Sequence, residues 1–430
     1  MQFPTRQTMA AEQLAQLRRL LAAVMLSNAF YRKKFAGIHP GIASLEEFTT
    51  RIPFTTKQEL VEDQRAAPPF GTNLTFPPSH YTRYHQTSGT TSAPLRWLDT
   101  PESWNGMVKS WMEVFRAAGT AAGDRVYFAF SFGPFIGFWL AFDAAQRLGC
   151  LCLPGGGLSS ASRLRCILDS RASVLCCTPS YATHLAEEAA REQINLKSGA
   201  VRALIVAGEP GGSIASTRQR IEGLWPRARV FDHHGMTETG PVSHECPQRR
   251  GTLHIMERAY LAEVIDGRGR PAAAGEAGEL VLTTLGRTGS PVLRYRTGDL
   301  ARARARGECV CGRHDLALEG GILGRTDDMV IVRGVNVFPT AVEEVLRGFA
   351  EVAEYRVDVD GSRSLAELSV RVEPRAECAE PEALARRVQE ALQRGFNLRI
   401  PVTPAPAGSL PRFEMKAKRW NLQGSLSPPP

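Results

Sequence analysis

The spacing of hydrophobic positions predicts a helical start to the chain. Between residues 9 and 36, apolar side chains recur at the helical period, which is typical of an amphipathic helix. Residues 53–60 predict a turn into a second helix, with Thr55 or Thr56 as its N-cap. A strand-like apolar segment follows at 95–98. The first hundred residues therefore predict helices and one strand.

From residue 124 to 206, strands and helices are predicted to alternate. Strands are expected at 125–130, 151–153, 174–177 and 201–207, and helices at 138–148, 160–170 and 181–191. Such alternation is typical of a parallel sheet covered by helices, in which binding sites form at the carboxyl ends of the strands. The loops expected at that edge are 131–134, 154–157, 178–180 and 208–210.

The last third of the chain predicts two further units. Short turn-bounded strands between about 250 and 324 indicate an antiparallel β subdomain. The predicted fold class is α/β. A large N-terminal domain, 1–324, has parallel-type sheets, helices and this β subdomain, and a small, mobile α+β domain spans 325–430. The end, 425–430, is expected to be disordered.

Composition restricts the class of protein but not its function. The chain has 430 residues, with 43% hydrophobic and 22% charged, as in soluble globular enzymes. No apolar run is long enough to cross a bilayer, and the N-terminus lacks the features of a secretory signal, so we expect a cytoplasmic protein without membrane contact. The net charge of +8 is spread along the chain, which favours a solvated arginine-rich surface over nucleic-acid binding.

Three polar segments are candidates for phosphate and nucleotide chemistry. The run 87–91, Thr-Ser-Gly-Thr-Thr, can turn its backbone N–H groups toward one point while its hydroxyls add donors. Glu238, after Thr237, could hold Mg²⁺ on a triphosphate, and Asp299 could accept the hydroxyls of a ribose. Taken singly, each is also explained as an ordinary surface turn, a helix start or a turn cap.

Nine cysteines without a secretory signal do not predict a disulfide framework. Cys246, His254, Cys309 and Cys311 supply three thiols and one imidazole, enough for a tetrahedral structural Zn²⁺. His244 or His314 could replace His254 as the fourth ligand.

An aromatic segment predicts a pocket for an uncharged ring. The candidate lining residues are Phe130, Phe132, Gly133, Phe135, Phe138 and Gly156. Some of these rings could equally be plain core. No acidic partner for an α-amine is evident, which disfavours an amino acid as substrate.

The order and spacing of four motifs resemble the adenylate-forming superfamily, and within it the phenylacetate–CoA ligase-like branch. These motifs are Thr-Ser-Gly-Thr-Thr at 87–91, Gly-Met-Thr-Glu at 235–238, Tyr-Arg-Thr-Gly-Asp at 295–299 and the run 324–339. The likeness extends from about residue 28 to about 420. It implies an AMP-forming acid–thiol ligase that uses ATP, Mg²⁺ and CoA or phosphopantetheine. A homodimer is compatible with it.

The resemblance also assigns roles to individual residues. Lys416, Thr237 and Glu238 would be catalytic, Glu238 as the Mg²⁺ ligand, and Arg325 and Asp327 would form the hinge of the small domain. The implied ATP/AMP-binding residues are Ser88, Gly89, Thr90, Thr91, Gly208, Glu209, Pro210, His234, Gly235, Met236, Thr237, Asp299 and Arg313. Lys418 is the alternative to Lys416.

The chain departs from the family pattern at three positions. It has Ser92-Ala93 where Gly-Lys is usual, His234 where tyrosine is usual, and Met415 where glycine usually precedes the lysine. Loss of the loop lysine removes a positive charge from the phosphate site, which predicts a weaker grip on ATP.

Three functional hypotheses follow from the sequence. The first is ATP-dependent activation of an aryl or arylacetic acid as its acyl-adenylate, with transfer to CoA. The second is an adenylating enzyme that loads a carrier protein or serves a biosynthetic pathway. The third is an inactive binding protein on a ligase scaffold that retains structural zinc.

Overall fold

The computed structural model describes residues 3–87, 94–332, 335–360, 367–413 and 417–423. Four helices form the N-terminal part: α1 (Arg6–Ser27), α2 (Ala29–Lys34), α3 (Leu45–Arg51) and α4 (Lys57–Ala66). The helix predicted at 9–36 is interrupted at Asn28, which ends α1 and caps α2 by accepting a hydrogen bond from the Tyr31 N–H. Thr56 caps α4 in a capping box with Glu59.

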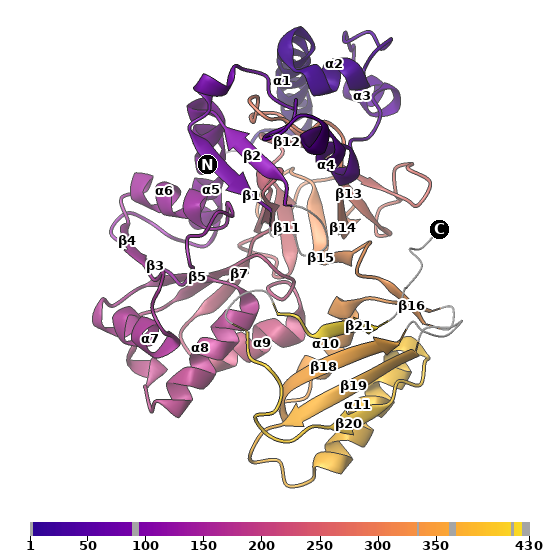
Figure 1. Ribbon diagram of the computed structural model, residues 1–430. Coiled ribbons are helices and arrows are strands. Elements are labelled where there is room, and N and C mark those ends of the chain that lie inside the picture. The colour runs from indigo at the N-terminus through magenta and orange to yellow at the C-terminus, as the bar shows by residue number, and fades with distance from the viewer. Residues whose placement is uncertain (1–2, 88–93, 333–334, 361–366, 414–416, 424–430) are drawn as a thin grey trace.

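A five-stranded parallel sheet, in the order β4-β3-β5-β6-β7, lies toward the left in Figure 1. Its strands are β3 (Arg125–Phe128), β4 (Leu151–Pro154), β5 (Val174–Cys177), β6 (Ala203–Val206) and β7 (Arg229–Asp232). The four predicted strands of this region are all present. β7 ends shortly before Gly235, where the sequence also predicts a strand end.

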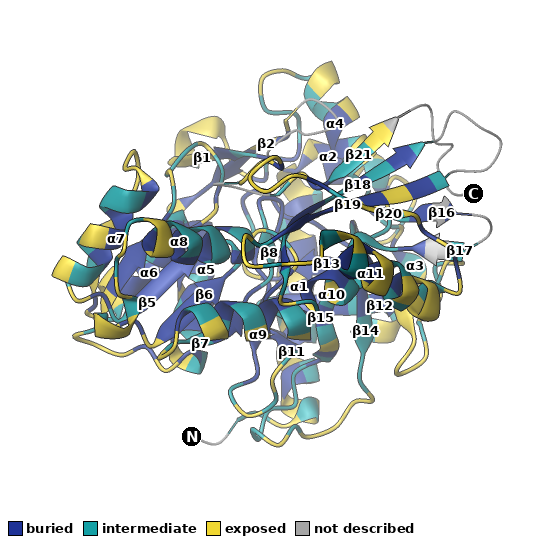
Figure 2. Cartoon of the chain, turned by 90° about the horizontal axis from the view of Figure 1, so that it is seen from below, coloured by how far each residue is buried: buried dark blue, intermediate teal, exposed yellow. Residues whose placement is uncertain are grey.

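Helices cover both faces of this sheet. On one face lie α7 (Ser160–Asp169), α8 (Pro179–Arg191) and α9 (Ala215–Leu224), which pack against alternate strand residues such as Leu175 and Cys177. On the other lie α5 (Pro101–Ala117) and α6 (Trp139–Arg147), against Val174 and Cys176. The central strands are buried on both sides, as Figure 2 shows, which explains their nearly continuous apolar sequences.

A six-stranded antiparallel sheet follows, in the order β10-β11-β15-β14-β13-β12. Its strands are β10 (Ser243–Glu245), β11 (Thr252–Ile255), β12 (Tyr260–Ile265), β13 (Ala277–Thr284), β14 (Tyr295–Ala303) and β15 (Ala317–Arg325). Two short hairpins accompany it: β1 (Arg83–Gln86) with β2 (Arg96–Asp99), and β8 (Gly235–Met236) with β9 (Gly240–Pro241). The β-rich region was predicted correctly. β14 and β15 were missed because glycine and arginine interrupt their apolar pattern.

The C-terminal domain has its own sheet and hydrophobic core. After the hairpin β16 (Val330–Val332) and β17 (Val335–Val337), it comprises α10 (Pro339–Arg347), β18 (Val352–Asp360), β19 (Glu367–Pro374), α11 (Pro381–Phe396), β20 (Val402–Pro404) and β21 (Trp420–Gln423). The sheet order is β20-β19-β18-β21. α10 packs against α9, so this domain lies beside the parallel sheet (Figure 1). The α/β fold class with a separate C-terminal domain is confirmed.

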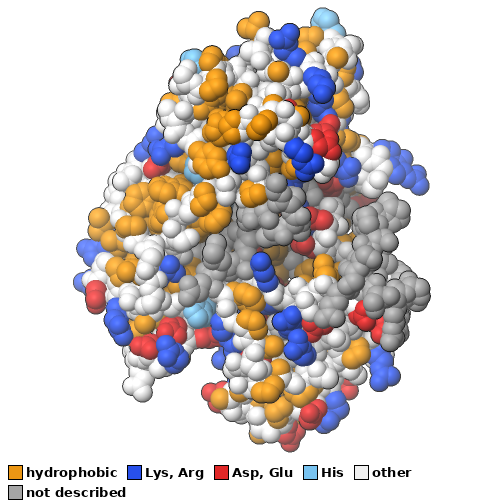
Figure 3. All heavy atoms as spheres, viewed as in Figure 1, with side chains coloured by type: hydrophobic (Ala, Val, Ile, Leu, Met, Phe, Trp, Pro, Cys, Tyr) orange, Lys and Arg blue, Asp and Glu red, His pale blue; other side chains and the backbone are white. Residues whose placement is uncertain are grey.

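The surface and the helices bear on two of the composition arguments. On the face shown in Figure 3, Lys and Arg side chains lie among acidic and hydrophobic ones and are not gathered into one band. In the part of the chain that is described, no helix is long and apolar enough to cross a membrane.

Candidate active site

The candidate site lies at the carboxyl edge of the parallel sheet, where β5, β6 and β7 end. The loop 178–180 follows β5, 208–210 follows β6, and His233 and His234 follow β7. Because parallel strands all end at the same edge, these loops meet although they are distant in the sequence. A hydrogen bond joins two of them directly, since the Glu209 carboxylate accepts from the Ser180 N–H at 2.8 Å.

Asp299 is the carboxylate at which three segments of the chain converge. His234 Nε2, after β7, lies 2.9 Å from Asp299 Oδ2, and Arg325 Nη1, at the end of β15, lies 3.0 Å from Oδ1. Gly298 precedes Asp299 at φ +75°, and a Cβ there would lie 2.8 Å from Arg325 Nη2. The positive φ favours glycine at 298, and a side chain there would also displace the Arg325 guanidinium.

Arg325 also reaches the start of the predicted hinge. Its Nε lies 2.8 Å from Asp327 Oδ1 and its Nη2 lies 3.1 Å from Oδ2. Although burial acts in the opposite direction, the hydrogen bond to Asp327 and the charge of Asp299 raise the pKa of Arg325. The guanidinium thus links the ribose candidate, Asp299, to the segment that leads into the C-terminal domain.

Thr237 and Glu238 lie in the tight turn between β8 and β9, and both are buried. Glu238 Oε1 accepts a hydrogen bond from the Tyr295 hydroxyl at 3.3 Å and lies 4.0 Å from Lys57 Nζ. A carboxylate in this position, with one oxygen so engaged, has the hard oxygen donors that Mg²⁺ prefers. Lys57 adds a positive charge that the sequence reasoning did not assign to the site.

A buried ion pair supports this turn. Arg287 and Asp99 have side chains only 2% and 0% exposed, and they pair through Nε–Oδ1 at 2.7 Å and Nη2–Oδ2 at 2.6 Å. The third guanidinium nitrogen, Nη1, donates to the Thr237 carbonyl at 2.7 Å. Arg287 thus fixes the backbone of the turn that carries Glu238. Sequence reasoning missed this residue because a single arginine after a strand carries no pattern.

Asp232, at the end of β7, is a second residue that the sequence did not reveal. Its carboxylate accepts hydrogen bonds from the Ser213 hydroxyl and the His233 N–H. Burial raises the pKa of Asp232, with Ser213 acting in the opposite direction. Gly321 closes the other side, at φ +68°, where a Cβ would collide with the Ser213 side chain. A carboxylate at the carboxyl end of a parallel strand was the available signal.

The predicted aromatic residues come together in the loop after β3. Ring centroids of Phe130 lie 5.6 Å from Phe132 and 6.4 Å from Phe135, and both pairs are edge-to-face. All three rings are half-buried, whereas Phe138 belongs to the core. A Cβ on the exposed Gly156 would lie 3.7 Å from the Phe132 ring, so the glycine loop after β4 faces this cluster.

Arg313 does not lie where the resemblance placed it. It was expected near Asp299, but its guanidinium contacts Asp315 at 3.2 Å and Glu113 at 3.4 Å and lies over the Phe3 ring. Arg325 occupies the place beside Asp299 instead. The assignment followed an arginine in a recognisable local motif, whereas register in the β14–β15 pair brings Arg325 opposite Asp299.

The four predicted metal ligands do come together. The ligand atoms of Cys246, His254, Cys309 and Cys311 all lie within 4.8 Å of one another. Cys246 Sγ and Cys309 Sγ are 3.8 Å apart, and Cys311 Sγ is 3.4 Å from His254 Nε2. Zn–S bonds of about 2.3 Å at tetrahedral angles place sulfurs about 3.8 Å apart, so this donor set fits zinc. The cluster ties the loop between β14 and β15 to β10 and β11.

Several predicted residues lie outside the described part of the chain. These are Ser88, Gly89, Thr90 and Thr91 of the phosphate loop, the departures Ser92, Ala93 and Met415, the catalytic candidate Lys416 and the tail 425–430. Their predicted roles stay predictions.

Comparison with known proteins identifies the family. The AMP-binding enzyme family matches residues 49–286, and the AMP-binding enzyme C-terminal domain matches 334–421. Phenylacetate-coenzyme A ligases of Thermus thermophilus and Escherichia coli are 36% and 32% identical to the chain. The first comparison covers 95% of both chains, and the second covers 90% of this chain and 89% of the relative. The chain belongs to the AMP-binding enzyme family. It is an acid–thiol ligase of the phenylacetate-CoA ligase-like branch, as the resemblance implied.

Solved structures show which arrangement of domains this ligase adopts. A 2-hydroxyisobutyryl-CoA ligase in its postadenylation state matches with a TM-score of 0.92 at 29% identity, over 98% of this chain and 90% of that chain. The same relative in its thioesterification state matches with a TM-score of only 0.74 at 30% identity, over 98% and 91%. Because identity and coverage are nearly equal, the difference reflects how the two domains are placed. The placement of the domains in this ligase is therefore more similar to that of the relative in its postadenylation state.

The role of Arg287 can be tested with a pair of variants. Arg287→Met removes the donor to Thr237 but also leaves Asp99 buried without its partner, which costs about 3–5 kcal/mol of folding free energy. The double variant Arg287→Met/Asp99→Leu removes both charges and is expected to regain most of this stability. Acid-dependent pyrophosphate release should nevertheless stay about tenfold or more below wild type, because the Thr237 carbonyl has lost its donor. Thermal unfolding and initial rates of release are the measurements.

Wild-type rates in a well-folded double variant would contradict this role.

Proposed function

We propose that this ligase activates an aryl or arylacetic acid with ATP and transfers the acyl group to the thiol of CoA. The observation that carries the proposal is the contact of Asp299 with both His234 and Arg325, while Glu238 is joined to the same strand, β14, through Tyr295. The half-buried rings of Phe130, Phe132 and Phe135 favour a flat, uncharged acyl group. The names of the phenylacetate-coenzyme A ligases that resemble the chain support the same class of acid.

In the first step, a carboxylate oxygen of the acid attacks the α-phosphorus of ATP, and the bond to the β-phosphate breaks with loss of pyrophosphate. Both reactants are anionic, so positive charge and hydrogen-bond donors must offset their repulsion as the transition state forms. Thr237 would contact the α-phosphate, Asp299 the ribose hydroxyls, and residues 88–91 the β- and γ-phosphates. Magnesium bound at Glu238 would neutralise phosphate charge. Lys416 would supply a further positive charge.

In the second step, the thiol attacks the acyl carbonyl of the acyl-adenylate, and AMP leaves. The resemblance places the hinge for this step at Arg325 and Asp327, between a large domain of 1–324 and a small one of 325–430. Arg325 already contacts both Asp299 and Asp327. Rotation there would withdraw Lys416 and present 329–334 to the acyl-adenylate, as expected when one site performs two reactions in sequence.

We also propose that Cys246, His254, Cys309 and Cys311 hold a structural Zn²⁺. Support comes from the distances among the four donors, which match a tetrahedral site. The nearest catalytic candidates belong to other loops, so the metal would fix the 304–316 loop to the sheet and take no part in acid activation.

The proposed acid class and the role of Lys416 are tested together by pyrophosphate release. With ATP, Mg²⁺ and a panel of benzoic, arylacetic and short aliphatic acids, we expect release with the aromatic acids. Lys416→Ala should lower the rate at least about 100-fold, because the charge that offsets phosphate repulsion is lost. Lys418→Ala, two residues away on an exposed side chain, is the matched control and should retain activity.

Release with no acid at all, in a folded wild type, would overturn the ligase proposal and favour the binding-protein hypothesis. The acceptor is then identified by mass spectrometry. An acyl-CoA thioester supports the proposal, whereas acylation of a phosphopantetheinyl carrier protein with no reaction on CoA supports the carrier-loading alternative.

The zinc proposal predicts about one Zn²⁺ per chain in protein purified without chelator, measured by elemental mass spectrometry. Cys309→Ser should lose the metal and unfold at a lower temperature, because a structural metal contributes its binding energy to folding. Cys378→Ser, which alters a partly buried thiol outside the cluster, should keep both the zinc and the unfolding temperature. The site would be disproved if wild-type protein contained no zinc as purified and Cys309→Ser left the unfolding temperature unchanged.

A further inference from the structure

Charged and polar contacts join the C-terminal domain to α8, α9 and the loop after β6. Among the described residues, the contacts made to these elements are Glu209 with the Ala417 N–H, Arg419 with Ser180, Arg220 with the carbonyls of Val352 and Ala353, and Glu187 with Arg412. We call the first three contacts the interdomain clasp. All of them are made in an arrangement of the domains that resembles the postadenylation state of the relative more than its thioesterification state.

Glu209 is the part of the clasp that lies closest to the nucleotide site. Its Oε1 accepts from the Ser180 N–H at 2.8 Å and its Oε2 accepts from the Ala417 N–H at 2.9 Å. One carboxylate therefore bridges a loop of the parallel sheet and the C-terminal domain. Because Ala417 follows Lys416 directly in the sequence, this bond fixes the backbone immediately after the catalytic candidate.

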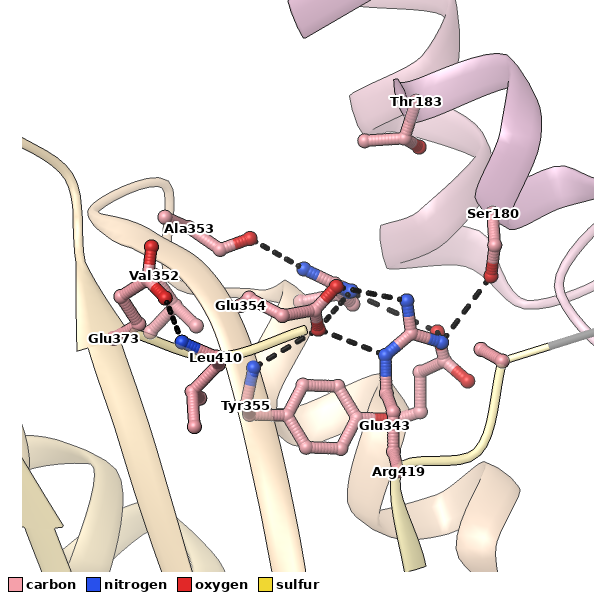
Figure 4. Close-up of polar contacts among 12 residues, drawn as sticks. Ser180, Thr183, Glu343, Val352, Ala353, Glu354, Tyr355, Glu373, Leu410 and Arg419 are labelled. Atoms are coloured by element: carbon pink, nitrogen blue, oxygen red, sulfur yellow. Dashed lines mark hydrogen bonds and ion pairs between the residues drawn. The ribbon is translucent and has the colours of Figure 1, made fainter. Parts of the chain in front are cut away.

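Arg419 forms the second contact and is itself anchored inside the C-terminal domain (Figure 4). Its Nη1 donates to Ser180 Oγ at 3.2 Å, while Nε and Nη2 pair with the two oxygens of Glu354 at 2.8 and 3.1 Å. Although burial opposes ionisation, the guanidiniums of Arg347 and Arg419 lower the pKa of Glu354 to about 2. Arg419 is thus held rigidly by a charged partner while it reaches α8.

Arg220 forms the third contact from the opposite side. On α9, its side chain is only 8% exposed, and its Nη1 and Nη2 donate to the Val352 and Ala353 carbonyls at 2.6 and 3.1 Å. Burial, with the charges of Arg347 and Arg375 nearby, lowers the pKa of Arg220 to about 10. Burial of a charged group is unfavourable unless hydrogen bonds compensate for its lost hydration. Two of the hydrogen bonds that Arg220 donates go to the other domain.

We propose that the interdomain clasp is a state-specific device that holds this ligase in its acid-activating arrangement, with Arg220 as a positioning residue for the first half-reaction. The inference rests on the proposed function. Its physical basis is that these bonds depend on the placement of the C-terminal domain. They stabilise the arrangement in which they are made and leave the thiol-transfer arrangement without that stabilisation.

Arg220 gives the clearest test, because it takes no part in the nucleotide or acid site. Arg220→Met keeps the length and apolar contacts of the side chain but removes every donor. The two half-reactions are measured separately: pyrophosphate release with ATP and acid, and CoA-dependent consumption of supplied acyl-adenylate. We expect the turnover number of the first to fall about tenfold with the KM for ATP unchanged, and the second to be equal to wild type or faster.

Two matched variants separate positioning from folding. Arg220→Lys retains a charged donor and should recover part of the first half-reaction. Arg202→Met removes an arginine of the same sheet unit that pairs with Asp124 and the Gly119 carbonyl, within the large domain. It should leave the ratio of the two half-reactions unchanged. Thermal unfolding confirms that each variant is folded.

The outcomes distinguish the inference from the function on which it rests. A wild type that releases no pyrophosphate with any acid overturns the proposed function and this inference together. An active wild type overturns the inference alone if Arg220→Met slows both half-reactions equally or neither of them. If the variant proves unfolded, Ser180→Ala provides the same comparison, since it removes the hydroxyl that accepts the hydrogen bond from Arg419.

Discussion

The geometry of this ligase depends on the carboxylate of Asp299, because three otherwise separate parts of the chain meet there. His234 reaches it from the end of the parallel sheet, β14 carries it, and Arg325 reaches it from the last strand before the C-terminal domain. A buried carboxylate needs partners, and here the two partners are His234, which is predicted to lie at the nucleotide, and Arg325, which is predicted to lie at the hinge. The same interaction therefore fixes a binding group and marks the point from which the second domain departs.

A second ionic contact, between Arg287 and Asp99, supports the turn that carries Glu238, the candidate Mg²⁺ ligand. His234 and Arg325 hold Asp299, the candidate ribose ligand, in a similar way. The pairs Arg287–Asp99 and Arg325–Asp299 both belong to the β-rich part of the molecule. The first holds the Thr237 turn, and the second contacts His234, which follows the last strand of the parallel sheet. The α/β layer thus presents the loops and the antiparallel layer holds them in position. Binding groups and their supports come from different layers, which explains why the short motifs are recognisable while their supports are scattered.

The sequence predicted the parts of the structure that have local signals. The strands of the parallel sheet follow from their apolar runs, and the ligand set Cys246, His254, Cys309 and Cys311 follows from residue chemistry. Residues that act through tertiary contacts were not predictable in this way. Arg287 and Asp232 carry no local pattern, and Arg313 was assigned in place of Arg325 because only strand pairing decides which arginine faces Asp299. Nothing in one sequence reports the register of β14 with β15.

The cysteine–histidine cluster has a consequence for how the protein matures. Its donors come from the end of β10, from β11 and from the loop between β14 and β15, so they become neighbours only when these strands have paired. An ion that requires all four donors can be captured only late in assembly. The proposed Zn²⁺ would therefore bind only after the β-rich layer has formed, and a chain without the metal would lack this link between the strands.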